Sequence, residues 1–490
     1  MKVSIVTEGL YNRGYGHITR CLSFYQAFEE RNLFPTLLIN GDDECKPFIP
    51  ETRHEIFDWL NNQDELIEKI SNSDIVIVDS YLAPLDLYRR IASVTALPVY
   101  IDDYMRLDYP EGIVVNGSIN AEQLGYPTKA GTTYLLGPKY TPLRKDFWTG
   151  REKIIKGDIQ SVLITFGGQD LENLTPRLLR MMVRNQPELK KNIVVGSGFR
   201  NIDLINEAKD DQTEIFYSPS GAEMMKIMLE SDIAISAAGQ TIYELARLGV
   251  PTIAITVAQN QENNLTGWIK EEFLTTYFNY ETVNLENRLL VVLNSYAERE
   301  VRLKLSAIGR KKVDGLGARR IIQSVLDHTI NRNGGCYLRK ALDVDTMTVF
   351  NLSNERSVRL NSVNQTQIKW QDHLQWYKEK INDNNCFFLL AFNGSDEFVG
   401  QVRFDIKLNY AVISISLDKK FRGKGLSSPL LIKSSFQCLK EKPKVKSILA
   451  YIRPANTPSI KAFASAAYLF SHEEIINDEK FLVYKLVRKV

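Results

Sequence analysis

The stretch RGYGHITRCLSF, residues 13–24, joins the first apolar run of the chain to a helical pattern. The run before it, VSIV at 3–6, is short and typical of a buried strand. Gly14 and Gly16 permit the backbone angles of a sharp turn, which other residues resist. Apolar side chains then recur at helical spacing, at Ile18, Cys21, Leu22, Tyr25 and Phe28. The stretch therefore predicts a strand, a tight turn and a helix with one buried face.

His17 falls in the first turn of this helix, beyond the carboxyl end of the first strand. In open α/β sheets, ligands bind beyond the carboxyl ends of the strands. The amino end of a helix offers free N–H groups and a partial positive charge to an anion. The same positive charge should hold an imidazole neutral, as a general base requires. From these residues alone, His17 is either a structural turn residue or a catalytic base beside an anionic substrate.

Strand-like runs and helical patterns alternate over the first 330 residues. The first set of runs lies at 3–6, 74–79, 98–102 and 112–116, and the second at 161–166, 192–196, 232–236 and 251–256. Such runs, separated by helices, indicate parallel strands that are buried on both faces. Turn signals at 137–147 divide the two sets. We therefore expect two doubly wound α/β (Rossmann-like) domains, 1–145 and 146–330, with a cleft between them.

The pattern changes after residue 330. Residues 331–344 are expected to form a linker, because NRNGGCYLRK is polar and contains a glycine pair. Three runs, 386–393, 397–406 and 410–418, then follow one another with short turns, which indicates antiparallel pairing. Helices over about 425–439 and 457–466 alternate with strands at 447–453 and 480–487. Residues 345–490 are therefore predicted to form a separate α+β domain.

Composition excludes several classes of function. A length of 490 residues suits roughly three domains of about 150 residues. A net charge of +2 without a dense basic stripe argues against a nucleic-acid partner. No run of about 18 apolar residues predicts a membrane span, and the start MKVSIVTEGL does not resemble a signal peptide. The five scattered cysteines suggest no zinc site, so we expect a cytoplasmic protein with reduced thiols.

A second glycine-containing turn lies in SAAGQTIYELARLGVPTIAITVAQNQENN, residues 236–264. A strand ends at Ser236, and small residues lead into a helix, whose amino end is suited to a pyrophosphate. Glu244, one turn inside the helix, is a candidate acceptor for ribose hydroxyls. The amides of residues 259–261 suit a sugar or a base edge. The alternative for this segment is an ordinary turn between a strand and a helix.

Taken together, six segments resemble one family. They are GYGHITRCL from Gly14, VDSY from Val78, IDD from Ile101, GPKYTPLRKDF from Gly137, FGG from Phe166, and the region from Ser236 to Gln261. In this order they resemble the UDP-sugar hydrolases of the pseudaminic acid pathway, which have the two-domain GT-B fold. The chain departs from the family at AAGQT, 237–241, where Gln240 is bulkier than the usual small residue.

The resemblance implies that water displaces UDP, with inversion, from UDP-2,4-diacetamido-2,4,6-trideoxy-β-L-altrose, without a metal. His17 would deprotonate or orient the water, and Tyr81 and Asp79 would face the same cleft. Tyr81 and Asp79 are equally well explained as turn and packing residues. The implied UDP-sugar-binding residues are Gly14, Tyr15, Gly16, Gly168, Ser236, Ala238, Gly239, Gln240, Glu244, Asn260 and Gln261.

The third domain contains FRGKGLSSPLL, residues 421–431, after a predicted strand. Successive N–H groups that close into a helix can hold a pyrophosphate, and the glycines permit close approach. This loop, with Asn456 and Ser459 after a later strand, resembles the acetyl-CoA site of the GNAT N-acetyltransferases. The implied acetyl-CoA-binding residues are Leu417, Arg422, Gly423, Lys424, Gly425, Leu426, Ser427, Asn456 and Ser459.

The front of this domain, 354–377, resembles acetyltransferases that act on UDP-4-amino sugars. The resemblance places Arg359, Asn361, His373 and Trp376 near the acceptor, although Trp376 also suits the core. Phe463 occupies the position where many GNAT members have the tyrosine that protonates the leaving thiolate. Tyr468 or another group would then serve as the acid, or the thiolate would leave unaided.

The two resemblances fit one sequence of reactions. The third domain would acetylate the 4-amino group of a UDP-sugar with acetyl-CoA, and the first two domains would then remove UDP. One alternative is a glycosyltransferase on the same scaffold, which uses an alcohol in place of water. Another is that the third domain is a degenerate module that binds an acyl-CoA or a nucleotide sugar. The exact stereochemistry of the sugar stays open, because the shape of the pocket determines it.

Overall fold

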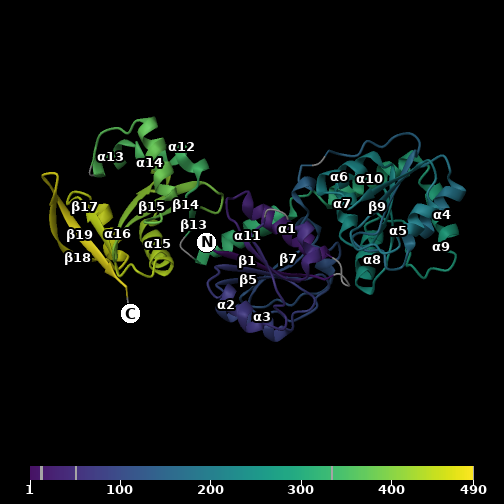
Figure 1. Ribbon diagram of the computed structural model, residues 1–490, viewed down its shortest axis with the longest axis horizontal. Coiled ribbons are helices and arrows are strands. Elements are labelled where there is room, and N and C mark those ends of the chain that lie inside the picture. Colours follow the sequence, from purple (N-terminus) through teal and green to yellow (C-terminus); the bar gives the residue numbers. More distant parts are fainter. Residues whose placement is uncertain (11–14, 50–51, 150, 333–334, 363, 489–490) are drawn as a thin grey trace. The chain divides into compact units, whose positions relative to one another are not determined.

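The computed structural model describes residues 1–10, 15–49, 52–149, 151–332, 335–362 and 364–488. The chain divides into two compact units, Lys2–Val325 and Leu326–Val490, the latter together with Met1. The first unit contains two parallel α/β sheets, and the second contains a mixed sheet (Figure 1). The predicted fold class, two Rossmann-like domains followed by an α+β domain, is therefore confirmed.

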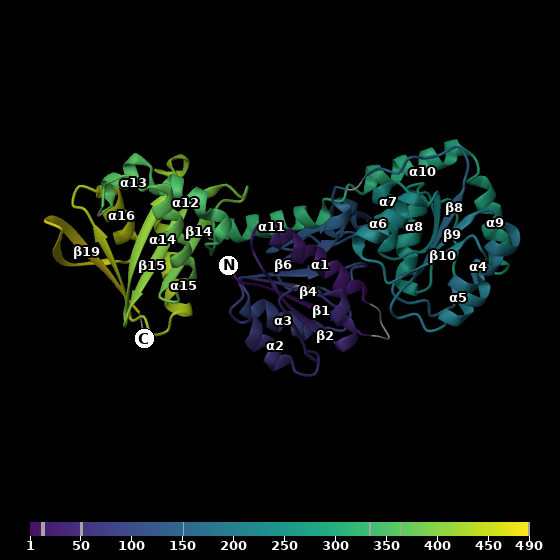
Figure 2. The ribbon, with the colours of Figure 1, turned by 45° about the horizontal axis from the view of Figure 1, so that its top comes forward.

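The first sheet has seven parallel strands in the order β3-β2-β1-β4-β5-β6-β7. Its strands are β1 (Val3–Gly9), β2 (Thr36–Gly41), β3 (His54–Ile56), β4 (Ile75–Asp79), β5 (Leu97–Ile101), β6 (Gly112–Asn116) and β7 (Thr132–Leu136). Its helices are α1 (Gly16–Glu29), α2 (Gln63–Ile70) and α3 (Leu85–Val94). Helices α2 and α3 cover one face of the sheet and α1 covers the other (Figures 1 and 2).

The order of this sheet positions the site. Strand β1 lies beside β4, with Thr7 opposite Asp79 in the register. The residues that follow these two positions, Glu8 and Ser80, therefore also come close together at the carboxyl ends of the strands. Strand order reverses between β1 and β4, which is where open α/β sheets bind ligands.

The second sheet has five parallel strands in the order β10-β9-β8-β11-β12. They are β8 (Ser161–Thr165), β9 (Lys190–Val195), β10 (Thr213–Tyr217), β11 (Ile233–Ala237) and β12 (Thr252–Ile255). The helices of this part are α4 (Leu174–Asn185), α5 (Ile202–Ala208), α6 (Gly221–Glu230), α7 (Thr241–Leu248), α8 (Glu262–Lys270), α9 (Leu285–Ser295) and α10 (Arg299–Lys312). Apolar side chains from both faces of the sheet are buried under these helices, as the uninterrupted apolar runs predicted.

The two α/β sheets of the first unit share packing. Ile119, Leu143 and Phe147, which follow strands of the first sheet, belong to the same buried cluster as Leu245 and Trp268. The next helix, α11 (Gly317–Arg332), returns to the end of α1 through an ion pair of Arg319 with Glu30. Because these contacts join residues from both α/β domains, the two halves form one compact unit rather than two separate bodies.

The third sheet has the order β13-β14-β15-β16-β17-β19-β18, and its one parallel pair among the described residues is β16 with β17. Its strands are β13 (Tyr337–Lys340), β14 (Cys386–Phe392), β15 (Phe398–Lys407), β16 (Tyr410–Leu417), β17 (Ser447–Ile452), β18 (Leu469–Ile476) and β19 (Glu479–Val487). Its helices are α12 (Thr346–Ser353), α13 (Arg356–Asn361), α14 (Trp370–Asn382), α15 (Ser427–Glu441) and α16 (Thr457–Ser465). Buried residues of α15 and α16 pack on one face of the sheet, and those of α12 and α14 on the other.

One predicted boundary needs correction. The segment 331–344, predicted as a linker, contains strand β13, which pairs with β14 and has buried side chains at Tyr337, Leu338 and Arg339. Arg339 is compatible with burial because Asp345 accepts two hydrogen bonds from it, both at 2.7 Å. A polar sequence thus forms an edge strand, because tertiary contacts compensate for its charge.

Candidate functional site

Helix α1 presents His17 at the carboxyl edge of the first sheet. Gly14 lies outside the described residues, and Gly16 begins the helix. Tyr15, predicted to contact the substrate, is instead 4% exposed and stacks on Phe48 with 4.5 Å between ring centroids. Its side chain therefore packs against Phe48 and does not line the cavity described below.

Asp79 orients the imidazole of His17. The carboxylate is fully buried at the end of β4, and its Oδ1 lies 2.7 Å from His17 Nδ1. Arg20 donates to both oxygens of Asp79, from Nε and from a terminal nitrogen, each at 2.7 Å. Burial raises the pKa of Asp79, but Arg20 and His17 lower it by a larger amount. The net pKa lies below its usual range, so the carboxyl group stays ionised. Asp79 can therefore only accept, so Nδ1 carries the proton and Nε2 is left as the basic nitrogen.

The pKa of His17 shifts in the direction opposite to the one expected from the helix end. Burial lowers the pKa of His17, but the charge and hydrogen bond of Asp79 raise it by more. The net direction is upward from 6.5, because a carboxylate at 2.7 Å acts more strongly than the partial charge of a helix terminus.

Two further carboxylates lie close to this pair. Asp103 accepts a hydrogen bond from Arg20 at 2.6 Å and a second from the Tyr81 hydroxyl. The ring of Tyr81 meets His17 edge to face at 4.5 Å. Glu8, near the end of β1, lies with its Oε1 4.0 Å from His17 Nε2. His17 is thus enclosed by acidic and aromatic groups that fix its orientation.

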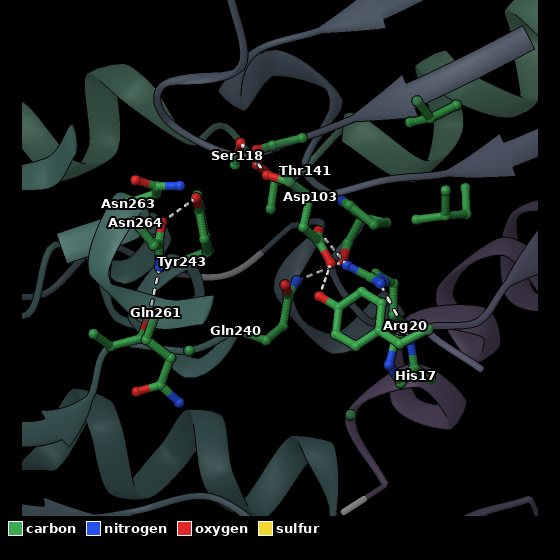
Figure 3. Close-up of a pocket in the computed structure, with 18 of the residues that line it drawn as sticks. His17, Arg20, Asp103, Ser118, Thr141, Gln240, Tyr243, Gln261, Asn263 and Asn264 are labelled. Atoms are coloured by element: carbon green, nitrogen blue, oxygen red, sulfur yellow. Dashed lines mark hydrogen bonds and ion pairs between the residues drawn. The ribbon is translucent and has the colours of Figure 1, made fainter. Parts of the chain in front are cut away.

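A cavity of about 440 Å³ opens at this cluster and is lined by residues of both α/β domains. Such a volume is in the usual range for small-molecule sites. Figure 3 shows His17, Arg20 and Asp103 on one side and Tyr243, Asn264 and Gln261 on the other, with Gln240 between them. The lining residues that were predicted are Gly16, His17, Tyr81, Ala238, Gly239, Gln240 and Gln261.

The wall opposite His17 is rich in amides. The turn Ala238–Gln240 precedes helix α7, whose first N–H groups lack partners within the helix. Asn264 holds this turn by donating to the Ala238 carbonyl oxygen at 2.6 Å, and Tyr243 donates to Asn264 at 2.5 Å. Gln240 donates to the Pro142 carbonyl oxygen at 3.0 Å. Gln240 therefore joins the turn before α7 to Pro142, and both residues line the cavity.

Other predicted binding residues lie away from the cavity. Ser236 is fully buried, and its hydroxyl donates to the Ala237 carbonyl oxygen at 3.1 Å. Glu244, predicted to accept from ribose, is buried and accepts two hydrogen bonds from Arg144, at 3.0 and 2.8 Å. Burial raises the pKa of Glu244, and Arg144 opposes this shift. Its carboxylate is thus already engaged within the protein, which corrects the ribose assignment.

Gly168 and Asn260 were also predicted to bind the UDP-sugar. Gly168 is exposed after β8, beside the end of β11, and does not line the cavity. The side chain of Asn260 lies outside the described residues. Sequence reasoning also missed several cavity residues, among them Glu8, Ser118, Tyr243 and Asn264. The signal for Glu8 was a charged residue near the end of an otherwise uncharged, fully buried first strand.

Among the residues that the structure describes, no group of three or more His, Cys, Asp or Glu side chains is arranged to hold a metal ion. Within the same residues, no helix has the length and apolar character needed to cross a membrane.

In the third domain, the predicted acetyl-CoA loop connects β16 to α15. Gly423 and Gly425 both adopt a φ of 75°, and a side-chain carbon built at either would meet nothing within 4 Å. The loop is thus an open backbone cradle in front of a helix amino end, which fits a pyrophosphate. Arg422 does not face this cradle: it donates to both oxygens of Glu355 and to the Leu417 carbonyl oxygen, and so anchors the loop.

The two parallel strands of this sheet separate next to the loop. Strands β16 and β17 pair over Tyr410–Val412 and Ser447–Leu449, but each extends beyond this paired region. The remaining predicted acetyl-CoA residues border the loop and this opening. Lys424 lies over the ring of Phe421 at 5.2 Å, Leu426 and Ser427 begin α15, and Asn456 begins α16 by accepting from the Ser459 amide at 3.2 Å.

The candidate acid of acetyl transfer is corrected. Tyr468 is 1% exposed, lies 2.6 Å from Ser435 Oγ and meets Phe463 edge to face at 5.0 Å. Burial raises the pKa of Tyr468 well above its usual range. Both aromatic residues therefore belong to the core, and Tyr468 is not available as a proton donor.

The four residues predicted to lie near the acceptor sugar do not share one environment. His373 is 1% exposed, and its Nε2 lies 3.2 Å from the Thr346 carbonyl oxygen. Burial lowers the pKa of His373, so it is a neutral packing residue. Trp376 packs under the guanidinium of Arg403 at 5.0 Å, and Arg359 and Asn361 lie on α13. Of these four residues, Trp376 packs against Phe388 of β14 and His373 packs against Trp376, so both help to hold α14 on the third sheet.

Comparison with known families separates the chain into two recognised parts. The sequence model of the glycosyltransferase family 28 C-terminal domain matches residues 162–302. That of the acetyltransferase (GNAT) family matches residues 352–468.

Three relatives are similar to this chain at 23% to 25% sequence identity. An uncharacterized protein of Methanocaldococcus jannaschii is 23% identical over 425 residues, 82% of this chain and 83% of that protein. The spore coat polysaccharide biosynthesis protein SpsG of Bacillus subtilis is 24% identical over 338 residues, 67% of this chain and 98% of that protein. The pseudaminic acid cytidylyltransferase and UDP-2,4-diacetamido-2,4,6-trideoxy-beta-L-altropyranose hydrolase of Helicobacter pylori is 25% identical over 265 residues, 53% of this chain. The match spans 45% of that last relative, less than half of its length.

Among solved structures, the aminoglycoside acetyltransferase AAC(6')-Ib with acetyl-CoA is similar to 31% of this chain, over 94% of its own length, with 16% identity and a TM-score of 0.29. The spermidine N-acetyltransferase of Vibrio cholerae with CoA and spermine is similar to 32% of this chain, over 96% of its own length, with the same identity and TM-score. The family matches carry the conclusion: the chain fuses a glycosyltransferase family 28 C-terminal-type, GT-B-like domain to a GNAT acetyltransferase domain.

Proposed function

We propose that this chain is a bifunctional enzyme that acts on UDP-linked amino sugars. Its third domain transfers an acetyl group from acetyl-CoA to the 4-amino group of a UDP-4-amino-4,6-dideoxy sugar. Its first two domains hydrolyse the product, UDP-2,4-diacetamido-2,4,6-trideoxy-β-L-altrose, to the free sugar and UDP, with inversion and without a metal. Acetylation comes first because the hydrolysed sugar carries both acetamido groups.

One observation carries the hydrolase proposal: His17, held by the buried Asp79, lines a cavity to which both α/β domains contribute. Asp79 fixes the proton on Nδ1, so Nε2 accepts a proton from water as the water attacks the anomeric carbon. The electron pair of the C–O bond leaves with UDP, and the imidazolium that forms is stabilised by Asp79. The distant similarity to the Helicobacter pylori enzyme supports this reaction.

The amide-rich wall would receive the leaving group. Among the described residues that line the cavity, Arg20 is the one lysine or arginine, and two carboxylates already engage it. The diphosphate would therefore bind to N–H groups at the amino end of α7 and to the side-chain amides of Gln240, Gln261 and Asn264.

In the third domain, the open loop at Gly423 and Gly425 and the amino end of α15 would hold the diphosphate of acetyl-CoA. The gap between β16 and β17 would receive its pantetheine arm, with Asn456 beside it. Acetyl-CoA supplies the acetyl group, and the protein aligns the amine of the sugar with it. Because Tyr468 is buried, another group would protonate the thiolate, or the thiolate would depart unaided.

The family 28 match favours one other candidate, a glycosyltransferase that transfers the sugar to an alcohol. The two candidates differ in their need for an acceptor: hydrolysis releases UDP from the sugar nucleotide alone. A degenerate third domain that only binds its ligand is the remaining alternative, and consumption of acetyl-CoA in the presence of a UDP-4-amino sugar excludes it.

The test is product analysis by mass spectrometry with a UDP-4-amino sugar and acetyl-CoA in ¹⁸O-labelled water. We expect the acetylated UDP-sugar first, and then free sugar with unlabelled UDP, because water attacks carbon and not phosphorus. Label in the UDP, or no UDP release without an alcohol acceptor, would contradict the hydrolase assignment.

A further inference from the structure

Glu8 presents a carboxylate that the sequence did not single out. It lies near the end of β1, is 3% exposed and lines the cavity. Three donors fix its orientation: the hydroxyl of Ser80, the amide of Tyr81 at 2.9 Å and the amide of Leu82 at 3.4 Å. These three hydrogen bonds hold the carboxylate so that its Oε1 faces the cavity and His17.

The distance between Glu8 and His17 is informative. Glu8 Oε1 and His17 Nε2 are 4.0 Å apart, which is too far for a direct hydrogen bond. A single water that donates one O–H to each of two acceptors at about 2.8 Å brings those acceptors to about 4.4 Å from each other. The observed separation is close to this value. Both atoms are acceptors, because Asp79 holds the imidazole proton on Nδ1.

We propose that Glu8 and His17 together hold the attacking water by its two O–H bonds, and that Glu8 makes the site selective for water over alcohols. The proposal rests on the hydrolysis proposed above. An alcohol has a single O–H, which Nε2 would accept, so its carbon chain would face the Glu8 carboxylate and Oε1 would lose the additional hydrogen bond that water donates. Such a mismatch disfavours the wrong nucleophile.

The reaction step balances with these groups. The water oxygen forms a bond to the anomeric carbon, and the bond between that carbon and the phosphate oxygen breaks, with its electron pair leaving on UDP. The proton of one O–H moves to His17 Nε2. The other O–H keeps its hydrogen bond to Glu8 Oε1 and becomes the hydroxyl of the sugar. This arrangement explains how a scaffold of glycosyltransferase type would transfer its sugar to water.

The experiment is a competition between two nucleophiles. The full-length wild type and the variants Glu8→Gln and Glu55→Gln hydrolyse UDP-2,4-diacetamido-2,4,6-trideoxy-β-L-altrose in mixtures of water and methanol. The free sugar and the methyl glycoside are then quantified. Their ratio does not depend on the fraction of folded enzyme, since both products arise from the same active molecules. Glu55→Gln is the matched control, because it makes the same change of a carboxylate to an amide at an exposed position of β3 that does not line the cavity.

We expect Glu8→Gln to raise the ratio of methyl glycoside to free sugar by about 10-fold or more, the effect of one lost hydrogen bond to a charged group, and Glu55→Gln to leave it unchanged. An unchanged ratio in Glu8→Gln, whether or not its rate falls, would assign Glu8 a purely structural role. An equal rise in Glu55→Gln would overturn the proposal as well. If the wild type releases no UDP at all, the proposed hydrolysis itself fails, which is a different outcome from an unchanged ratio.

Discussion

His17 lies among charged groups that come from three elements of the first α/β domain. Asp79 ends β4, Glu8 lies in β1, and Arg20 follows one turn later on α1. Asp79 and Glu8 raise the pKa of His17, whereas burial and Arg20 lower it. Since the proposed reaction requires neutral His17, the rate should rise with pH through the pKa of this residue, which lies above 6.5.

Asp79→Asn tests this arrangement through the pH profile. The substitution removes the charge that raises the pKa of His17, so the acid limb of the kcat/KM profile should move to lower pH. The plateau should fall by about 100-fold or more, because an amide does not hold the imidazole in the productive tautomer. Asp103→Asn is the control, since Asp103 contacts Arg20 and Tyr81 and not His17. An acid limb that stays in place in Asp79→Asn would contradict the assigned role.

Single elements differ in what their residues do. The loop before α15 uses two glycines at a φ of 75°, where a side chain would enter open space in front of the helix. Helix α10 has a structural role, because Arg302 is fully buried and donates to backbone carbonyl oxygens of Tyr296 and Lys156. The first element is suited to ligand binding, and the second holds together segments distant in sequence.

Gly425→Trp should weaken acetyl-CoA binding by about 10-fold or more, equivalent to about 1.4 kcal/mol, because the indole fills the cradle. Isothermal calorimetry with acetyl-CoA measures this effect. Gly125→Trp provides a matched control: Gly125 has a φ of 73° and equally open surroundings, but it lies in the first domain. Equal affinities in the two variants would refute the loop assignment.

Arg302→Met should lower the free energy of unfolding by about 2–4 kcal/mol, since several buried carbonyl oxygens lose their donor. Chemical denaturation of the variant checks this value. Arg299→Met, at an exposed position three residues earlier on α10, should cost less than about 1 kcal/mol. Similar losses in both variants would show that the buried contacts of Arg302 contribute little.

On the scale of the whole molecule, the two proposed activities use separate compact units, 2–325 and 326–490. His17→Ala should therefore reduce UDP release by about 100-fold or more and leave acetyl transfer unchanged. Gly425→Trp should show the opposite pattern. Each variant is assayed with both substrates, and His54→Ala, which changes an exposed histidine of β3, should alter neither rate. Loss of both activities in one variant would indicate a shared site.

The sequence by itself determined the class of each domain. Uninterrupted apolar runs indicate parallel strands that are buried on both faces, and consecutive runs with short turns indicate antiparallel pairing. The glycine turn at Gly423 and Gly425 could also be predicted, because the backbone angles of a turn are a local property. Strand β13 could not be predicted in this way, since its charged residue Arg339 is buried only with the help of Asp345.

The tertiary structure alone decided which polar groups face one another. Glu8 meets Ser80 because β1 and β4 are neighbours in the sheet, although 72 residues separate them in sequence. Glu244 and Tyr468 looked available as site residues, but Arg144 engages the first and the core encloses the second. Hydrophobic periodicity is local and repeats along the chain, so it can be read directly. The juxtaposition of side chains depends on strand order and packing between distant segments, and only the folded chain brings these together.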